Sequence, residues 1–285
     1  MVTSAAELEL HPWNTGFVWH DRVGPFQRLT AEQVEQFDTL GFLVIEDAFT
    51  DEELAPVIEA TDALDAKAEE FLSSRDDGRM FIAESGAITF GLFPVTTSEA
   101  ARRFSAHPVF TDLCIDLVGP NVRLYHDQAV YKKPEKPRRF PWHQDNGYTF
   151  VEPQQYLTCW VALTDATVEN GCPQVAPGLH RLGTLQHHYN DPLGWEIFED
   201  PPSSIPAPVA KGGIVVFSSL SPHLTGPNTT DAVRKAYILQ YAPDGARILK
   251  GDTSGLPTMT AAADDPVRQF PVVIDRQRID PPPLG

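Results

Sequence analysis

The sequence is poor in cysteine and in basic residues, and it has no long hydrophobic run. Its three cysteines are widely spaced and form no C-x-x-C pair, so neither a disulfide framework nor a zinc ribbon is indicated. The N-terminus lacks a basic stretch followed by an apolar one, and no segment approaches the roughly 20 apolar residues that cross a bilayer. We therefore expect a cytoplasmic protein that does not associate with membranes.

Basic residues are also outnumbered by acidic ones. The 22 Lys and Arg residues stand against 39 Asp and Glu residues, which gives a formal net charge of −17. Such a charge repels phosphate backbones and anionic lipid. Nucleic acid is excluded as a partner on this ground, and we expect a small-molecule substrate and a monomer or homodimer.

Two capping-box patterns, which begin at Thr30 and Thr50, each predict the start of a helix. The first helix should end at Gly41, ahead of a strand over 42–45. The second helix contains Pro56 beyond its first turn, so we expect it to kink or restart there. Further short helices are predicted within 98–118.

Short β-rich runs separated by Gly, Pro and Asn dominate from residue 121 onward, which is typical of an antiparallel sandwich or barrel. Helices followed by strands predict an α+β fold, mainly β, with the N-terminal helices packed outside a β core. We expect a single domain over 1–285. It should comprise an N-terminal arm and helical region (1–120), a β-barrel core (121–245) and a C-terminal extension (246–285).

The stretch PWHQDNGY, residues 141–148, places a histidine and an aspartate two positions apart. Residues i and i+2 of an extended segment face the same side, so His143 and Asp145 can bind one metal ion in the β core. His223, which follows an apolar strand, is the candidate for a third ligand. Two histidines and one carboxylate are the ligands of non-haem Fe(II) oxygenases, whereas zinc with the same ligands would indicate a hydrolase.

Two more residues extend this pattern: Thr225 and Arg234 stand two and eleven positions after His223. The H-x-D motif, the distant H-x-[ST] motif and the following arginine together resemble the phytanoyl-CoA dioxygenase-like family of Fe(II)- and 2-oxoglutarate-dependent oxygenases. The resemblance covers roughly residues 29–243 and includes the stretches LTAEQVEQFDTLGFLVI, NGCPQVAPGLHR and PHLTGPNTT.

The resemblance implies a double-stranded β-helix, a barrel similar to jelly rolls and cupins, with iron between its two sheets. His143, Asp145 and His223 match the iron ligands of the family. Arg234 matches the arginine that pairs with the distal carboxylate of 2-oxoglutarate, a role suited to the forked guanidinium.

Other residues match the co-substrate pocket of the family. Thr225 matches a hydroxyl that assists the distal carboxylate, Gln144 a polar co-substrate contact, and Trp160 an aromatic wall. Gln128 and Tyr131, on the preceding strand, are further candidates for the same pocket.

The implied activity is hydroxylation of an unactivated C–H bond in a small organic metabolite, with release of succinate and CO2. It uses Fe(II), 2-oxoglutarate and dioxygen, with ascorbate as a candidate reductant. Halogenases of related families lack the metal-binding carboxylate, so the presence of Asp145 favours hydroxylation. Desaturation, epimerisation and ring formation remain open, as do a metal-dependent hydrolase and a non-catalytic jelly-roll binding protein.

A basic segment precedes the metal motif in this acidic chain. It contains Lys132, Lys133, Lys136, Arg138 and Arg139. It is either an electropositive lip that steers an anionic substrate towards the metal or a solvated hairpin loop.

Aromatic and histidine residues near the metal motif allow similar alternatives. Tyr148, Phe150 and Tyr156 either line a substrate cavity or fill the core. The remaining histidines of this region, His180, His187 and His188, are expected in a solvent-exposed loop.

Overall fold

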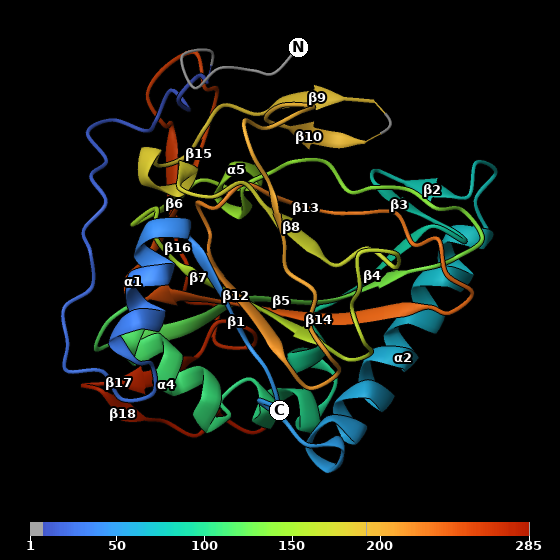
Figure 1. Ribbon diagram of the computed structural model, residues 1–285, viewed down its shortest axis with the longest axis horizontal. Coiled ribbons are helices and arrows are strands. Elements are labelled where there is room, and N and C mark those ends of the chain that lie inside the picture. Colours follow the sequence, from blue (N-terminus) through green and yellow to red (C-terminus); the bar gives the residue numbers. More distant parts are fainter. Residues whose placement is uncertain (1–7, 192, 285) are drawn as a thin grey trace.

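A large antiparallel sheet forms the centre of the computed structural model, which describes residues 8–191 and 193–284 (Figure 1). Its strands run in the order β1 (Phe42–Ile45), β12 (Ile214–Ser218), β7 (Leu157–Ala162), β14 (Arg234–Pro243), β5 (Val122–Lys132), β4 (Ile88–Leu92), β3 (Ala83–Glu84) and β2 (Arg79–Met80). Next to β5 lies β17 (Pro271–Ile274), which pairs with β18 (Gln277–Arg278). The main sheet therefore takes strands from all three expected segments of the chain.

A smaller sheet faces the main one and consists of β11 (Ile205–Pro206), β8 (Pro173–Val175) and β13 (His223–Thr225). Side chains of both sheets, including Val175, Phe217 and Ile238, pack into one buried cluster between them. Two facing antiparallel sheets of this kind make a double-stranded β-helix, which confirms the predicted fold class. The remaining strands are β6 (Val151–Glu152), β15 (Arg247–Lys250) and β16 (Met259–Ala262) in a third sheet, and the hairpin β9 (His188–Asn190) and β10 (Gly194–Glu196).

Alternation along the main strands divides the core into two parts. On β14, Ala236 and Ile238 face the small sheet, whereas Tyr237, Leu239 and Tyr241 belong to the cluster packed beneath the helices. This period of two is what a strand buried on both faces requires. The inner face of the main sheet is thereby left for the functional site, and the outer face carries the larger apolar core.

Helices cover the outer face of the main sheet. They are α1 (Ala31–Leu40), α2 (Asp51–Ser73), α3 (Glu99–Phe104) and α4 (Pro108–Leu117), with the short α5 (Asp145–Tyr148) at the metal motif and 3-10 turns at Pro94–Thr96 and Leu179–Leu182. Both predicted capping boxes form, and Gly41 ends α1 with φ +85° in the left-handed region. None of the helices within 8–191 and 193–284 is both long enough and apolar enough to cross a bilayer.

The second helix does not restart at Pro56, because α2 runs unbroken from Asp51 to Ser73. A proline removes the hydrogen bond to the carbonyl four residues earlier, here that of Glu52. Both Glu52 and Pro56 are exposed, so water can bond this carbonyl. The remaining turns of α2 are fixed by packing against β4 and β5 (Figure 1).

The N-terminal arm lies along the body and is anchored to α4 by one carboxylate. Asp116, which is buried, accepts hydrogen bonds from the backbone N–H groups of Gln27, Arg28 and Leu29 at 2.7, 2.9 and 3.0 Å. These bonds fix the backbone immediately before α1. The anchor therefore sets where α1 begins against the sheet.

We expect Asp116→Ala to lower the free energy of unfolding by about 3 kcal/mol, because it removes a charged acceptor of three backbone hydrogen bonds and leaves the buried amide of Leu29 without a partner. Urea denaturation measures the effect. Asp112→Ala is the matched control on the same helix: its carboxylate pairs with the half-exposed Arg278, so a loss of about 1 kcal/mol or less is expected. Equal losses in the two variants would contradict the anchoring role.

Candidate functional site

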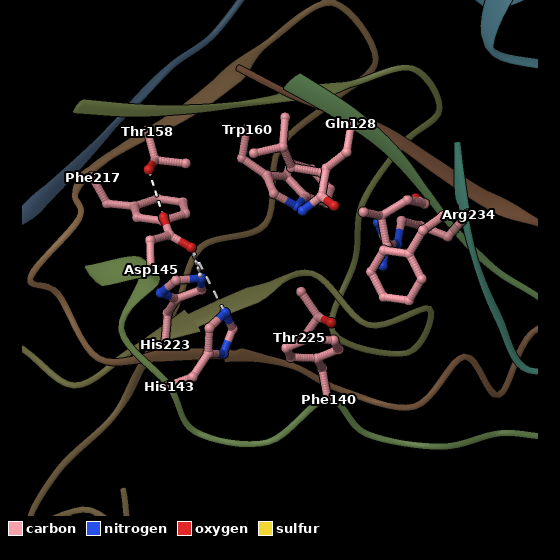
Figure 2. A pocket seen from close by; sticks show the side chains of 13 residues that line it. Gln128, Phe140, His143, Asp145, Thr158, Trp160, Phe217, His223, Thr225 and Arg234 are labelled. Atoms are coloured by element: carbon pink, nitrogen blue, oxygen red, sulfur yellow. Dashed lines mark hydrogen bonds and ion pairs between the residues drawn. The ribbon is translucent and has the colours of Figure 1, made fainter. Parts of the chain in front are cut away.

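The three predicted metal ligands converge between the two sheets (Figure 2). The ligand atoms of His143, Asp145 and His223 all lie within 4.8 Å of one another. Oδ1 of Asp145 is 3.8 Å from Nε2 of His143 and 3.9 Å from Nε2 of His223. Within the described parts of the chain this is the one group of His, Cys, Asp and Glu side chains arranged to hold a metal. Two imidazoles and one carboxylate are the donor set of a non-haem iron site.

Backbone and side-chain hydrogen bonds orient both histidines. His143 and His223 form an antiparallel bridge, with N–H to carbonyl distances of 2.9 and 2.8 Å. Each Nδ1 lies 2.9 Å from a carbonyl oxygen two residues earlier, that of Pro141 or Ser221. Since a carbonyl only accepts, each Nδ1 carries the proton and each Nε2 lone pair is left for a metal. Burial, and secondarily the neighbouring His223, hold the pKa of His143 well below its usual range, which keeps the ring neutral.

Asp145 begins α5 and is oriented from the main sheet. Its Oδ2 accepts a hydrogen bond from Oγ1 of Thr158 at 2.5 Å, which leaves Oδ1 directed at the two histidines. Thr158 lies on β7 among the residues that face the small sheet, and it is buried. The hydroxyl therefore fixes which carboxylate oxygen is free to bind a metal.

Arg234 lies in the same pocket as the three ligands (Figure 2). Its side chain is 1% exposed and stacks over the ring of Trp160 at 5.0 Å. Nη1 donates to the carbonyl of Val130 at 3.3 Å, but Nε and Nη2 have no partner among the described residues. Burial lowers the pKa of Arg234 to about 9. A buried guanidinium with two unpaired nitrogens is costly on its own and is suited to an anionic ligand.

Thr225, Trp160 and Gln128 also line this pocket, as the sequence predicted. Two further candidates do not. Gln144 is directed away, because its amide donates to the carbonyls of Gly183 and Leu220 and accepts from the N–H of Leu185.

The structure likewise corrects the placement of Tyr131 in the pocket. Its side chain lies on the outer face of β5, where its hydroxyl bonds to Thr61 at 2.9 Å and to Asp62 at 2.6 Å on α2. Both corrections have one cause: each residue stands an odd number of positions from a pocket residue, so alternation turns it to the other side.

The basic segment does not present a lip of free cations, and its turn, residues 135–137, is exposed. Lys132 is 1% exposed and its ammonium bonds to the carbonyls of Arg138, Thr225 and Gly226. The other four cations are paired: Lys133 with Asp65, Lys136 and Arg138 with Glu84, and Arg139 with Glu196. These contacts hold the segment to α2, β3 and β10, and they engage all five cations.

Two histidines expected in an exposed loop are buried instead, while His188 is exposed as predicted. His180 lies against Trp19 of the arm, with ring centroids 4.3 Å apart. Nε2 of His187 accepts a hydrogen bond from the N–H of Gln144 at 2.9 Å, between the two metal ligands. A β-carbon at Gly147 would lie only 1.9 Å from the His187 ring. His187 therefore supports the H-x-D-x-G segment from a distant part of the chain. No local sequence pattern revealed this contact.

A second cavity, of about 230 Å³, lies on the other side of the ligands. It shares His143 and Asp145 with the Arg234 pocket, but Arg234 does not line it. Tyr148 and Tyr156 line this second cavity, whereas Phe150 packs with His11 and Trp13. The metal site therefore stands at the boundary between two chambers.

Comparison with known proteins gives a consistent picture. The family model described as Phytanoyl-CoA dioxygenase (PhyH) matches residues 37–236. A zebrafish (Danio rerio) protein named phytanoyl-CoA dioxygenase domain-containing protein 1 is 26% identical, over 73% of this chain and 88% of that protein.

Among solved structures, EvdO2 from Micromonospora carbonacea var. aurantiaca, complexed with 2-oxoglutarate, is 26% identical with a TM-score of 0.59, covering 77% of this chain and 93% of that one. EctD from S. alaskensis, with 2-oxoglutarate and 5-hydroxyectoine, is 23% identical with a TM-score of 0.65 and 85% of each chain covered.

We expect Thr158→Val to weaken metal binding by roughly 10- to 100-fold, because Asp145 loses the hydroxyl that orients its carboxylate. Anaerobic titration calorimetry with Fe(II) or Co(II) measures the affinity. Thr158→Ser keeps the hydroxyl and is the matched control, with an affinity near that of the native protein. Native affinity in Thr158→Val would show that the Asp145 orientation does not depend on this bond.

Proposed function

The chain belongs to the phytanoyl-CoA dioxygenase family, and on this premise we propose that it is an Fe(II)- and 2-oxoglutarate-dependent dioxygenase that hydroxylates an unactivated C–H bond of a small organic metabolite. The observation that carries the proposal is the unpaired guanidinium of Arg234 in the same pocket as the metal ligands. A metal hydrolase or a passive binding module has no need of such a group. An oxygenase that must hold a dicarboxylate beside its metal does.

The residues present fit both implied groups. His143, Asp145 and His223 would hold Fe(II), since all three offer a free ligand atom to one point. Arg234 would bind the distal carboxylate of 2-oxoglutarate through its unpaired nitrogens, and the Thr225 hydroxyl lies in the same pocket. EvdO2, which is similar in sequence and fold, is known in complex with 2-oxoglutarate.

Each group of the pocket has a distinct part in the reaction. Bound Fe(II) and 2-oxoglutarate supply the oxidising chemistry with dioxygen, and the co-substrate leaves as succinate and CO2. Thr158 holds the Asp145 carboxylate in one orientation, and the two Nδ1–H bonds keep both imidazoles as lone-pair donors. The Trp160 ring covers Arg234 and keeps water from the guanidinium, which strengthens its pairing with a carboxylate.

Hydroxylation is favoured by the complete carboxylate-bearing triad, because Asp145 occupies the position that a halide would need. Desaturation, epimerisation and ring formation would use the same four residues. Mass analysis of the product distinguishes them: hydroxylation adds one oxygen atom, desaturation and ring formation remove two hydrogens, and epimerisation leaves the mass unchanged.

We expect anaerobic addition of Fe(II) and then 2-oxoglutarate to produce the weak visible charge-transfer band of a chelated co-substrate. His223→Ala should abolish the band, because it removes a ligand. Arg234→Ala should keep the band but need roughly 10- to 100-fold more 2-oxoglutarate, the effect of losing hydrogen bonds to a charged group. Tight metal binding without any band in the native protein would overturn the proposed function.

We expect Arg234→Met to raise the free energy of unfolding by about 1–3 kcal/mol when 2-oxoglutarate is absent, because it replaces an unpaired buried charge by an apolar side chain. Adding 2-oxoglutarate to the Zn(II)-loaded proteins should stabilise the native protein further and the variant much less, because the variant keeps the three metal ligands but lacks the guanidinium. Thermal and urea denaturation of both forms measure the two effects. A variant that is less stable than the native protein without co-substrate would contradict the idea that Arg234 awaits an anion.

A further inference from the structure

The residues that line the second cavity, beside the metal ligands, indicate the class of the substrate. It is lined by Ile82 and Phe90 from the β2–β4 region, by Tyr148 of α5, by Tyr156 just before β7 and by residues of β5 and β14. His143 and Asp145 form its inner end. A molecule in this cavity presents its bonds directly to the metal site, so the cavity is the substrate chamber under the proposed function.

Three polar side chains in the chamber lack partners although they are buried. Tyr125, Tyr156 and Gln240 are 8%, 3% and 6% exposed. Within residues 8–191 and 193–284, none of the three makes a side-chain hydrogen bond. Their polar atoms are accessible from the cavity. Each of these polar atoms therefore faces the cavity and is free to bond to a molecule held there. Oxygen atoms of a bound molecule would supply the missing partners.

Charged side chains, by contrast, are nearly absent from the chamber. Asp145 is the only charged residue that lines it in the described part of the chain. The nearby cations are occupied elsewhere: Arg139 pairs with Glu196, and Arg268 pairs with Asp265 at 3.1 Å while stacking on Phe93. Burial lowers the pKa of His126, so this lining imidazole is neutral as well. Among the described residues, no side chain that lines the chamber therefore offers a counter-charge to an anionic substrate.

Aromatic rings supply most of the remaining wall. Phe90, Phe140 and Tyr148 line the chamber, and the rings of Tyr125 and Tyr156 meet edge to face with centroids 5.3 Å apart. Flat aromatic walls pack well against the faces of a ring-shaped molecule. Their hydroxyls and the Gln240 amide can both donate and accept, which suits hydroxyl and carbonyl oxygens at the edge of such a ring.

We propose that the substrate is an uncharged ring compound bearing hydroxyl or carbonyl oxygens, selected by Tyr125, Tyr156 and Gln240; the inference rests on the proposed function and specifies its substrate class. Acyl thioesters of coenzyme A and free carboxylates are excluded by the same reasoning. They carry phosphate or carboxylate charge, and the cations of the basic segment that could have attracted them are already engaged by carboxylates and carbonyls of this chain.

The experiment compares matched neutral and anionic compounds on the full chain loaded with Zn(II) and 2-oxoglutarate. The neutral set contains methyl glycosides, inositols and hydroxylated lactones; the anionic set contains methyl glucuronides, quinate-type acids and octanoyl-CoA. Ligand-observed saturation-transfer NMR measures binding. With Fe(II) in place of Zn(II), succinate release measures coupled turnover. We expect binding and stimulated succinate release within the neutral set only.

Variants then locate the binding groups. Tyr156→Phe and Gln240→Leu each remove polar atoms while keeping the shape, so each should weaken binding of the best neutral compound roughly three- to tenfold. Their charge-transfer band with Fe(II) and 2-oxoglutarate should be unchanged. Tyr131→Phe is the control, because that hydroxyl contacts α2 and not the chamber.

The outcomes separate the two hypotheses. A normal charge-transfer band together with preferential binding of the anionic set, or with no binding in either set, overturns the substrate inference and leaves the oxygenase assignment standing. Loss of affinity in Tyr131→Phe equal to that in the chamber variants also overturns it. Absence of the band overturns the proposed function itself.

Discussion

Two backbone hydrogen bonds between His143 and His223 hold the site together. They join the segment that follows the basic loop to β13 of the small sheet, although the two histidines are far apart in the sequence. A directly opposed pair on an antiparallel ladder has its side chains on the same side, so the bridge brings both imidazoles to one point. Asp145 then follows as the first residue of α5, at a place where Thr158 can hold it. The pairing of the two segments therefore determines how the three candidate metal ligands are arranged.

Side chains alternate between the two faces of the main sheet, so one face stabilises the fold and the other lines the site. The outward residues of β7, β12 and β14 bury an extensive apolar cluster under the helices. That core can support an inner face which includes the buried guanidinium of Arg234, two of whose nitrogens have no partner among the described residues. Unpaired polar groups of this kind cost free energy in the unliganded protein. Bound ligands recover that cost, which is how the site gains affinity for them.

The fold class and the convergence of His143, Asp145 and His223 could be predicted from the sequence, because H-x-D and H-x-T are local patterns on extended segments. Two errors were avoidable: Gln144 lies between two ligands that face one way, and Tyr131 stands three positions after Gln128, so alternation alone places both outside the pocket. Other features depend on partners remote in the chain. Cations of the basic segment pair with Asp65, Glu84 and Glu196, and His187 supports the ligand loop from beyond residue 180. No local pattern encodes such pairs.

The two chambers differ in charge, and the metal site lies where they meet. On one side Arg234 offers an unpaired cation to a dicarboxylate, and on the other side Tyr125, Tyr156 and Gln240 offer only neutral groups. Asp145 lines both chambers, and no lysine or arginine of the described residues lines the second one. Under the proposed function, a dicarboxylate would therefore find a cationic partner only on the Arg234 side. Such a division would keep the co-substrate from occupying the place of the molecule to be oxidised.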